Sequence, residues 1–302
     1  MKPQGGASLG PVRRLLAALL ALFPAACAPV DLLNALVPIG GVEIARDIPY
    51  GRNPRQKLDV YRPRGQGVRP LVVFFYGGAW QTGSKALYRF AAAALARRGM
   101  TVVVPDYRIH PEVSFPGFIE DAAAAVAWAR VHAGDHGGNT RGIFVTGHSA
   151  GAYLAAMLAL DGRYLAAAGM ARADLAGAIG ISGPYDFLPL TRADLKPIFE
   201  VVPDPAVTQP ISFADGTNPP MLLITGQADA TVLPRNTLAL AARIRAKGGP
   251  VETRVYTGIG HIGTILALAP LFGWRAPVLD DISDFVARTA ERRAGERASA
   301  RD

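Results

Sequence analysis

Residues 142–160 read GIFVTGHSAGAYLAAMLAL, and this stretch decides the fold. Its first five residues, Gly142–Thr146, form a short apolar run typical of a buried strand, whereas Ala150–Leu160 is Ala-rich and predicts a helix. Between them stands Gly-x-Ser-x-Gly, whose glycines keep side chains from colliding with the adjacent strand and helix. The stretch predicts a sharp strand–turn–helix that exposes Ser149 at its turn.

The pentapeptide alone is weak evidence, because a chain with 33 glycines in 302 residues yields about 0.1 chance matches. Its position between a predicted strand and a predicted helix makes it informative. The amide dipoles at the N-terminus of that helix point at the oxygen of Ser149 and favour a developing negative charge. Ser149 is therefore the predicted nucleophile.

Apolar runs and helical stretches alternate on both sides of this turn. Further strands are predicted at Lys57–Tyr61, Leu71–Phe75, Thr101–Pro105, Ala176–Ser182, Met221–Thr225 and Glu252–Tyr256, and further helices at Ala86–Arg98, Ile119–Val131, Thr237–Ala246 and Asp280–Glu291. The alternation predicts an α/β fold with a mostly parallel sheet covered by helices on both faces. Residues 183–220 are rich in Pro and turn residues, which indicates a long loop or a short cap.

A serine hydroxyl needs a general base, and after a turn of this kind the acid and then the histidine follow along the chain. His261 is the only histidine after Ser149. It lies in a loop after the strand predicted at Glu252–Tyr256, at the edge of the sheet where a base should lie. Asp229 follows the preceding predicted strand and is the predicted acid, which would orient the imidazole of His261.

Consecutive glycines follow the strand predicted at Leu71–Phe75, in the sequence Tyr76-Gly77-Gly78-Ala79-Trp80. Glycines let backbone N–H groups turn toward a ligand without interference from a Cβ atom. This segment is the predicted place where an oxyanion is stabilised. With it, the sequence offers a nucleophile, a base, an acid and an anion site.

Together these residues resemble the α/β-hydrolase superfamily, in its esterase and lipase branch related to hormone-sensitive lipase and to small bacterial carboxylesterases. The similar pieces are spread over residues 58–290 and comprise Tyr76–Trp80, Asp106-Tyr107-Arg108, Gly147–Gly151 and the loops of Asp229 and His261. The resemblance implies the α/β-hydrolase fold. It also implies that the backbone amides of Gly78, Ala79 and Ala150 form the oxyanion hole.

The glycine-rich segment departs from that branch at two positions. Tyr76 stands where the family usually has His, and Ala79 stands where the lipase motif has a third Gly, although backbone donors survive both changes. The pattern Gly-Gly-x-Trp also resembles relatives of the prenylcysteine-methylesterase and kynurenine-formamidase kind. The resemblance therefore implies a serine carboxylesterase that needs no cofactor or metal. An amide or formamide hydrolase on the same fold, or a non-catalytic ligand-binding lipoprotein, remains an alternative.

The first 26 residues have the layout of a secretory signal. Lys2, Arg13 and Arg14 supply positive charge, residues 15–23 form an unbroken apolar run, and small residues precede Cys27. The run is shorter than the roughly 20 apolar residues that span a bilayer. Cys27 resembles the lipid-modified cysteine of bacterial lipoproteins. We therefore expect an exported protein, periplasmic or anchored to the membrane through Cys27, rather than a buried N-terminal helix.

The formal net charge of +8 is concentrated at the two ends of the chain. The signal has three basic residues and no acidic one, and residues 288–302 carry five arginines against three acidic residues. The body is left near +3, without a Lys/Arg cluster interleaved with aromatic residues. Nucleic acid is therefore not an expected partner, whereas a small-molecule ester is.

Two other patterns carry little weight. Gly258–Gly263 matches the dinucleotide fingerprint Gly-x-Gly-x-x-Gly, but no further strand follows to complete a βαβ unit. His132 and His136 are spaced like metal ligands, but Gly134 lies between them and the motif His-Glu-x-x-His is absent. The single cysteine excludes an intrachain disulfide and a Cys-based metal site.

The sequence thus predicts four segments. They are a signal peptide at 1–26, an N-terminal spacer at 27–54, an α/β-hydrolase catalytic domain at 55–290 and a charged C-terminal tail at 291–302. Because half of the residues are apolar and only 19% are charged, the chain has enough apolar material for a sizeable core and is not a disordered one.

Overall fold

The computed structural model describes Asn34, Val37 and residues 39–299. Contacts between residues divide the chain into two units, 1–36 and 37–302, and the sheet and its helices belong to the second unit. The predicted signal peptide and Cys27 lie outside the described residues.

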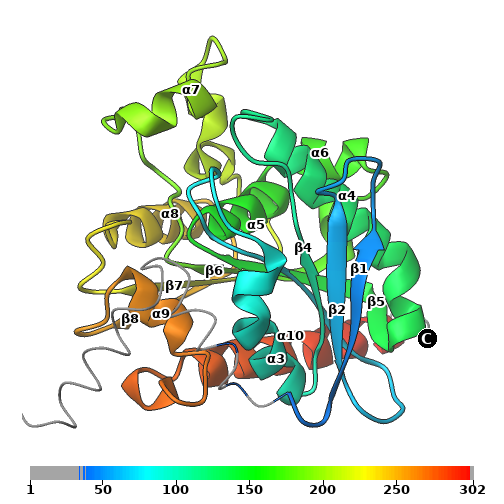
Figure 1. Ribbon diagram of the computed structural model, residues 1–302. Helices are drawn as coiled ribbons and strands as arrows, with labels where there is room; N and C mark the ends of the chain where they lie inside the picture. Colours follow the sequence, from blue (N-terminus) through cyan, green and yellow to red (C-terminus); the bar gives the residue numbers. More distant parts are fainter. Residues whose placement is uncertain (1–33, 35–36, 38, 300–302) are drawn as a thin grey trace, which may run out of the picture. The chain divides into compact units, whose positions relative to one another are not determined.

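One eight-stranded sheet organises this unit, with the strand order β1-β2-β4-β3-β5-β6-β7-β8 (Figure 1). The strands are β1 (Val42–Pro49), β2 (Lys57–Pro63), β3 (Arg69–Phe75), β4 (Thr101–Pro105), β5 (Gly138–His148), β6 (Leu175–Ile181), β7 (Met221–Gly226) and β8 (Val251–Tyr256). The β1–β2 and β2–β4 pairs are antiparallel, and the other five pairs are parallel. The predicted mostly parallel sheet is confirmed, since the seven strands expected from apolar runs are all present.

Helices cover both faces of the sheet. The α-helices of the described residues are α3 (Arg89–Arg97), α4 (Gly117–His132), α5 (Ala150–Leu160), α6 (Gly162–Ala167), α7 (Lys196–Phe199), α8 (Arg235–Ala246), α9 (His261–Leu266) and α10 (Val278–Ser299), and all but α7 lie around the sheet. α3 contacts α10 on one face, whereas α4 contacts α5 and α6 on the other (Figure 1). Within the described residues, we find no helix that combines the length and the apolar character needed to cross a membrane.

The predicted spacer at 27–54 requires a correction, because β1 lies inside it. Val42–Pro49 pairs with β2 along the edge of the sheet. The strand is hard to recognise in the sequence, since most of its residues are partly or fully exposed and its register shifts between Ala45 and Ile48. Residues 42–54 therefore belong to the folded unit.

The predicted charged tail at 291–302 requires a correction as well. α10 continues to Ser299, so residues 291–299 are helical. Arg293 donates hydrogen bonds to the carbonyl oxygens of Ala173 and Leu175, which fastens this helix to the start of β6. The Ala, Glu and Arg residues that look like a tail in the sequence are good helix formers.

The irregular stretch 183–220 forms a small cap made of short helical turns around α7 (Figure 1). It is tied to the loop before α4 by the amide of Phe115, which donates to the carbonyl oxygen of Ile198 at 3.0 Å. Of the two forms expected from the sequence, the cap is the one present. Below it, every residue of α5 is buried, which explains why that helix carries no charged side chain.

Candidate active site

Ser149 lies on a strained turn between β5 and α5. Its backbone angles are φ 55° and ψ −120°, a conformation that costs a non-glycine residue about 1–3 kcal/mol. The turn places the serine at the C-terminal end of β5 and directly before the first residue of α5. The strand–turn–helix predicted from the sequence is therefore present.

The two glycines around Ser149 are required because the turn packs against β3. A Cβ atom on Gly151 would lie 2.0 Å from the carbonyl oxygen of Phe75. A Cβ atom on Gly147 would lie 2.3 Å from the backbone carbonyl carbon of Gly151 and 2.7 Å from the same Phe75 oxygen. No side chain fits at either position.

His261 stands between Ser149 and Asp229. Its Nε2 lies 3.0 Å from Ser149 Oγ, and its Nδ1 lies 2.8 Å from Asp229 Oδ2. Because a carboxylate only accepts hydrogen bonds, Nδ1 carries the proton and Nε2 accepts the hydroxyl proton of Ser149. The structure thus brings the three predicted residues, which follow β5, β7 and β8, into one hydrogen-bonded row.

Asp229 is held as a carboxylate. Its side chain is buried, and its Oδ1 accepts hydrogen bonds from the amides of Thr231 and Val232 at 3.0 and 2.8 Å. Burial acts to raise the pKa of this carboxyl, but the hydrogen bonds from His261 and Val232 outweigh it, so the pKa lies below its usual value. A charged Asp229 can fix the orientation of the imidazole and stabilise its protonated form.

The segment 76–83, which we call the oxyanion loop after its predicted role, passes beside Ser149. A Cβ atom on Gly77 would lie 3.0 Å from Ser149 Cβ. Gly78, Ala79 and Trp80 all have positive φ angles, of 143°, 53° and 59°. A Cβ atom on Gly78 would lie 2.1 Å from the carbonyl oxygen of Thr82, so the turn tolerates only glycine there.

The third predicted oxyanion donor, Ala150, is the first residue of α5. An amide at that position has no acceptor within its own helix and is directed along the helix axis, out of its N-terminus. Gly78 and Ala79 directly follow Gly77, which lies beside Ser149, and Ala150 directly follows Ser149 at the start of α5. This arrangement suits a group that becomes negatively charged at the serine.

A second buried histidine adjoins the row. His148 Nε2 lies 3.2 Å from the carbonyl oxygen of His261, and its Nδ1 lies 3.0 Å from the hydroxyl of Tyr88. Burial and the neighbouring His261 lower the pKa of His148 to about 3. The ring is therefore neutral, with Nε2 as donor and Nδ1 as acceptor.

An aromatic cluster joins the oxyanion loop to the cap. The Trp80 ring lies 5.1 Å from Tyr153 on α5 and 4.7 Å from Phe199 on α7, both edge to face. Phe187 packs 5.2 Å from Phe199 in the same cluster. The side chain of Trp80, which follows the predicted oxyanion donors, is thus held in place by α5 and by the cap.

His132 and His136, which are spaced like metal ligands in the sequence, do not belong to a group of metal-binding side chains within the described residues. Across residues 39–299, no three His, Cys, Asp or Glu side chains gather as they would around a metal ion. His132 and His136 instead lie beside the ring of Trp128, at 5.1 and 6.5 Å between centroids.

Sequence reasoning missed several residues that support the site. Tyr88 contacts His148, whose ring contacts His261, and Arg55 contacts the oxyanion loop from the β1–β2 turn. These residues belong to no spaced motif. Only Tyr76 could have indicated such a partner from the sequence. A tyrosine in the place of the usual family histidine needs different hydrogen-bond partners.

The BD-FAE family matches residues 58–244, which is more than half of the chain. The match contains Ser149 and Asp229 and ends before His261. The chain belongs to the BD-FAE family.

Several curated proteins are similar to this BD-FAE chain, and two of them illustrate the range. The probable isoprenylcysteine alpha-carbonyl methylesterase ICMEL1 of Oryza sativa subsp. japonica is 29% identical over 267 residues, which are 80% of this chain and 62% of that protein. Kynurenine formamidase of Salmo salar is 34% identical over 146 residues, 48% of this chain and 47% of that protein. The chain spans about three fifths of the length of the first curated relatives it matches.

A solved structure supports the fold of this BD-FAE chain. Inhibited esterase B from Lactobacillus rhamnosis superposes with a TM-score of 0.75, covering 95% of this chain and 99% of that one at 22% identity. The expected α/β-hydrolase fold, with its mostly parallel sheet and helices on both faces, is therefore confirmed.

Proposed function

We propose that the protein is a serine hydrolase that cleaves a carboxylic ester through Ser149, His261 and Asp229. The observation that carries this proposal is the hydrogen-bonded row from Ser149 Oγ to His261 and on to the buried carboxylate of Asp229. The membership of the BD-FAE family and the esterase names of several relatives support it.

The first half of the reaction forms an acyl-enzyme. Ser149 Oγ attacks the ester carbonyl carbon while His261 Nε2 takes the hydroxyl proton. Asp229 accepts the hydrogen bond from Nδ1–H and stabilises the imidazolium that forms. The tetrahedral intermediate then collapses, and His261 returns the proton to the departing alcohol oxygen.

The oxyanion forms on the former carbonyl oxygen. The amides of Gly78, Ala79 and Ala150 are the proposed donors to it, and the positive end of the α5 dipole adds to their effect. Because these donors are fixed by backbone geometry before the substrate arrives, they cost no reorganisation during the reaction.

The second half of the reaction releases the acid. Water, deprotonated by His261 Nε2, attacks the acyl-serine carbonyl, and the proton returns to Ser149 Oγ when the acyl bond breaks. These reaction steps use the protein's own side chains, a small-molecule ester and water, without a cofactor.

The proposal is tested by comparing the protein with its Ser149→Ala variant on short p-nitrophenyl esters. We expect kcat to fall by about a thousandfold or more, because the nucleophile is lost while the fold is kept. Thermal unfolding of both proteins verifies the fold. Hydrolysis at the parent rate by Ser149→Ala would refute the proposal.

A second candidate function is hydrolysis of an amide or formamide, favoured by the similarity to kynurenine formamidase. The same residues would act, but His261 would have to protonate a poorer, amine leaving group. Parallel assays on an ester and a formamide of matched acyl and aryl parts separate the two. A non-catalytic lipoprotein would hydrolyse neither.

We further propose that residues 1–26 are a signal peptide and that Cys27 is lipidated, so that the protein is exported and either periplasmic or anchored to the membrane. The order of features in the sequence supports this proposal: positively charged residues come first, an apolar run follows, and small residues precede Cys27. Mass spectrometry of the mature N-terminus should find a lipid-modified Cys27. A mature chain that retains Met1, or begins after Cys27, would exclude the anchor.

A further inference from the structure

The oxyanion loop needs support from outside itself. Ala79 and Trp80 hold positive φ angles although neither is glycine, and such conformations persist only where surrounding structure enforces them. Within the loop, the amides of Gln81 and Thr82 donate to the carbonyl oxygen of Gly78. These contacts shape the turn but do not fix its two ends.

Arg55 holds both ends of the oxyanion loop at once. Its Nη2 donates to the hydroxyl of Tyr76 at 3.0 Å and to the carbonyl oxygen of Gly83 at 2.6 Å. Its Nε donates to the carbonyl oxygen of Tyr107 at 2.7 Å. One guanidinium therefore joins the start of the loop, its end and the segment that follows β4.

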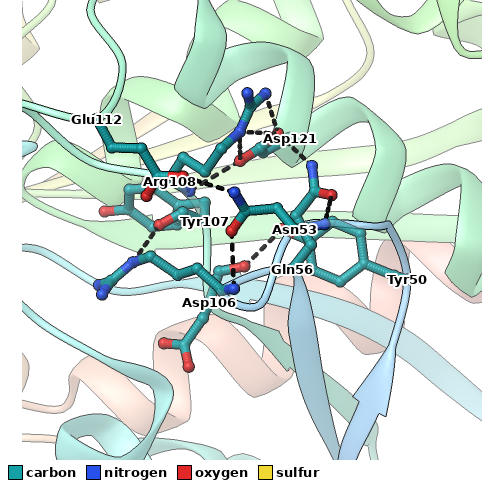
Figure 2. Close-up of polar contacts among 9 residues, drawn as sticks. Tyr50, Asn53, Gln56, Asp106, Tyr107, Arg108, Glu112 and Asp121 are labelled. Carbon is teal, nitrogen blue, oxygen red and sulfur yellow. Dashed lines mark hydrogen bonds and ion pairs between the residues drawn. The ribbon is translucent and has the colours of Figure 1, made fainter.

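Arg55 is itself fixed by the β1–β2 turn. Its amide donates to Asn53 Oδ1 at 2.8 Å, and its neighbour Gln56 donates to Asp121 Oδ1 on α4 at 2.7 Å. Figure 2 shows Gln56 and Arg108 converging on the same Asp121 carboxylate. The turn is thus anchored on α4, and Arg55 needs little reordering to reach the loop.

Tyr76, whose hydroxyl accepts a hydrogen bond from Arg55, is itself held in a fixed position. Its ring stacks on Tyr107 at 4.5 Å between centroids, and the Tyr107 hydroxyl donates to the Tyr76 carbonyl oxygen at 2.8 Å. Burial and the nearby Asp106 carboxylate raise the pKa of Tyr76, so its phenol stays protonated. The hydroxyl oxygen of Tyr76 accepts the hydrogen bond from Arg55.

We propose that Arg55 is a positioning residue that fixes the oxyanion loop and thereby aims the amides of Gly78 and Ala79 at the reacting oxygen. The inference rests on the proposed esterase function. These amides bind the oxyanion more strongly than they bind the ester carbonyl. Loss of the Arg55 contacts therefore raises the activation free energy and leaves substrate binding nearly unchanged.

The test compares Arg55→Gln with the matched variant Arg108→Gln. Arg108 belongs to the same network, but its side chain pairs with Asp121 on α4 rather than with the oxyanion loop. In Arg55→Gln we expect kcat on a p-nitrophenyl ester to fall about 10- to 100-fold with KM little changed. Arg108→Gln should lower the unfolding temperature and leave kcat close to the parent value.

A second measurement separates positioning from general destabilisation. An aryl trifluoromethyl ketone adds to the serine and forms an oxyanion, so its inhibition constant should rise in Arg55→Gln by the same factor as kcat falls. Arg55→Lys keeps the charge on a single donor nitrogen in place of the three of arginine and should give a smaller loss. It also provides the comparison if Arg55→Gln does not fold.

Several results would overturn the inference without touching the proposed function. They are parent-like kcat in both Arg55 variants, an equal loss in Arg108→Gln, or a loss confined to KM. A parent protein that hydrolyses no ester would instead contradict the proposed function.

Discussion

At the scale of single residues, the direction of the hydrogen bonds at His261 decides what the site can do. Nδ1 faces a charged, buried carboxylate, which leaves Nε2 as the acceptor for the serine proton. The opposite tautomer would place a proton between Nε2 and Ser149 Oγ and remove the base. Asp229 therefore acts through the tautomer it selects.

Replacing Asp229 by Asn tests this role. An asparagine can donate to Nδ1 and so favours the wrong tautomer, and we expect kcat to fall on the order of 10⁴-fold with a smaller change in KM. Steady-state kinetics on a p-nitrophenyl ester measure this. A loss below tenfold in folded Asp229→Asn would show that another group orients His261.

His148 makes stability depend on pH. Its pKa is about 3 in the folded protein, below the usual value of 6.5 that applies to the unfolded chain. Between these values the unfolded chain binds a proton and the folded one does not, so stability falls as pH decreases from 6.5 toward 3. The contribution is up to about 1.4 kcal/mol for each pH unit.

The variant His148→Gln removes this titration. We expect its free energy of unfolding to fall less between pH 7 and pH 4.5 than that of the parent protein. Urea unfolding at the two pH values measures the difference, and any constant cost of the substitution cancels. Equal losses in both proteins would mean that His148 is protonated in the folded state.

At the scale of elements, the turn between β5 and α5 depends on close contact with β3. Gly151→Ala would place Cβ 2.0 Å from the backbone oxygen of Phe75, so we expect a markedly lower unfolding temperature and loss of ester hydrolysis. The control is Gly295→Ala on α10, where nothing lies within 4 Å of the new Cβ.

In contrast to Gly151→Ala, Gly295→Ala should raise the free energy of unfolding by about 0.5–1 kcal/mol, because alanine has a higher helix propensity than glycine. Thermal unfolding of the two variants measures both effects. A Gly151→Ala protein as stable and active as the parent would contradict the close packing of the turn on β3.

The elements also show what sequence patterns can predict. Buried strands such as β4 and β7 are nearly continuous apolar runs, so the predicted bounds match β4 and end one residue before the end of β7. The edge strand β1 has no such run, since one side faces solvent and its register shifts. The end of α10 looks like a tail because an exposed helix is as charged as a disordered segment.

At the scale of the whole molecule, the topology explains why the grouping of Ser149, Asp229 and His261 was predictable. Parallel strands end at one edge of the sheet, so the loops after β5, β7 and β8 meet there although Ser149 and His261 are 112 residues apart. Arg55 was not predictable in this way. Its position depends on how the β1–β2 turn packs on the segment after β4 and on α4, which no periodicity encodes.

Every step of the proposed reaction depends on Ser149, activated by His261, being the nucleophile. Labelling with a fluorophosphonate, read by intact-protein and peptide mass spectrometry, tests this role most directly. We predict one adduct per chain on Ser149 in the parent protein, none in Ser149→Ala, and strongly slowed labelling in His261→Gln. An adduct on another residue, or none in folded parent protein, would contradict the account.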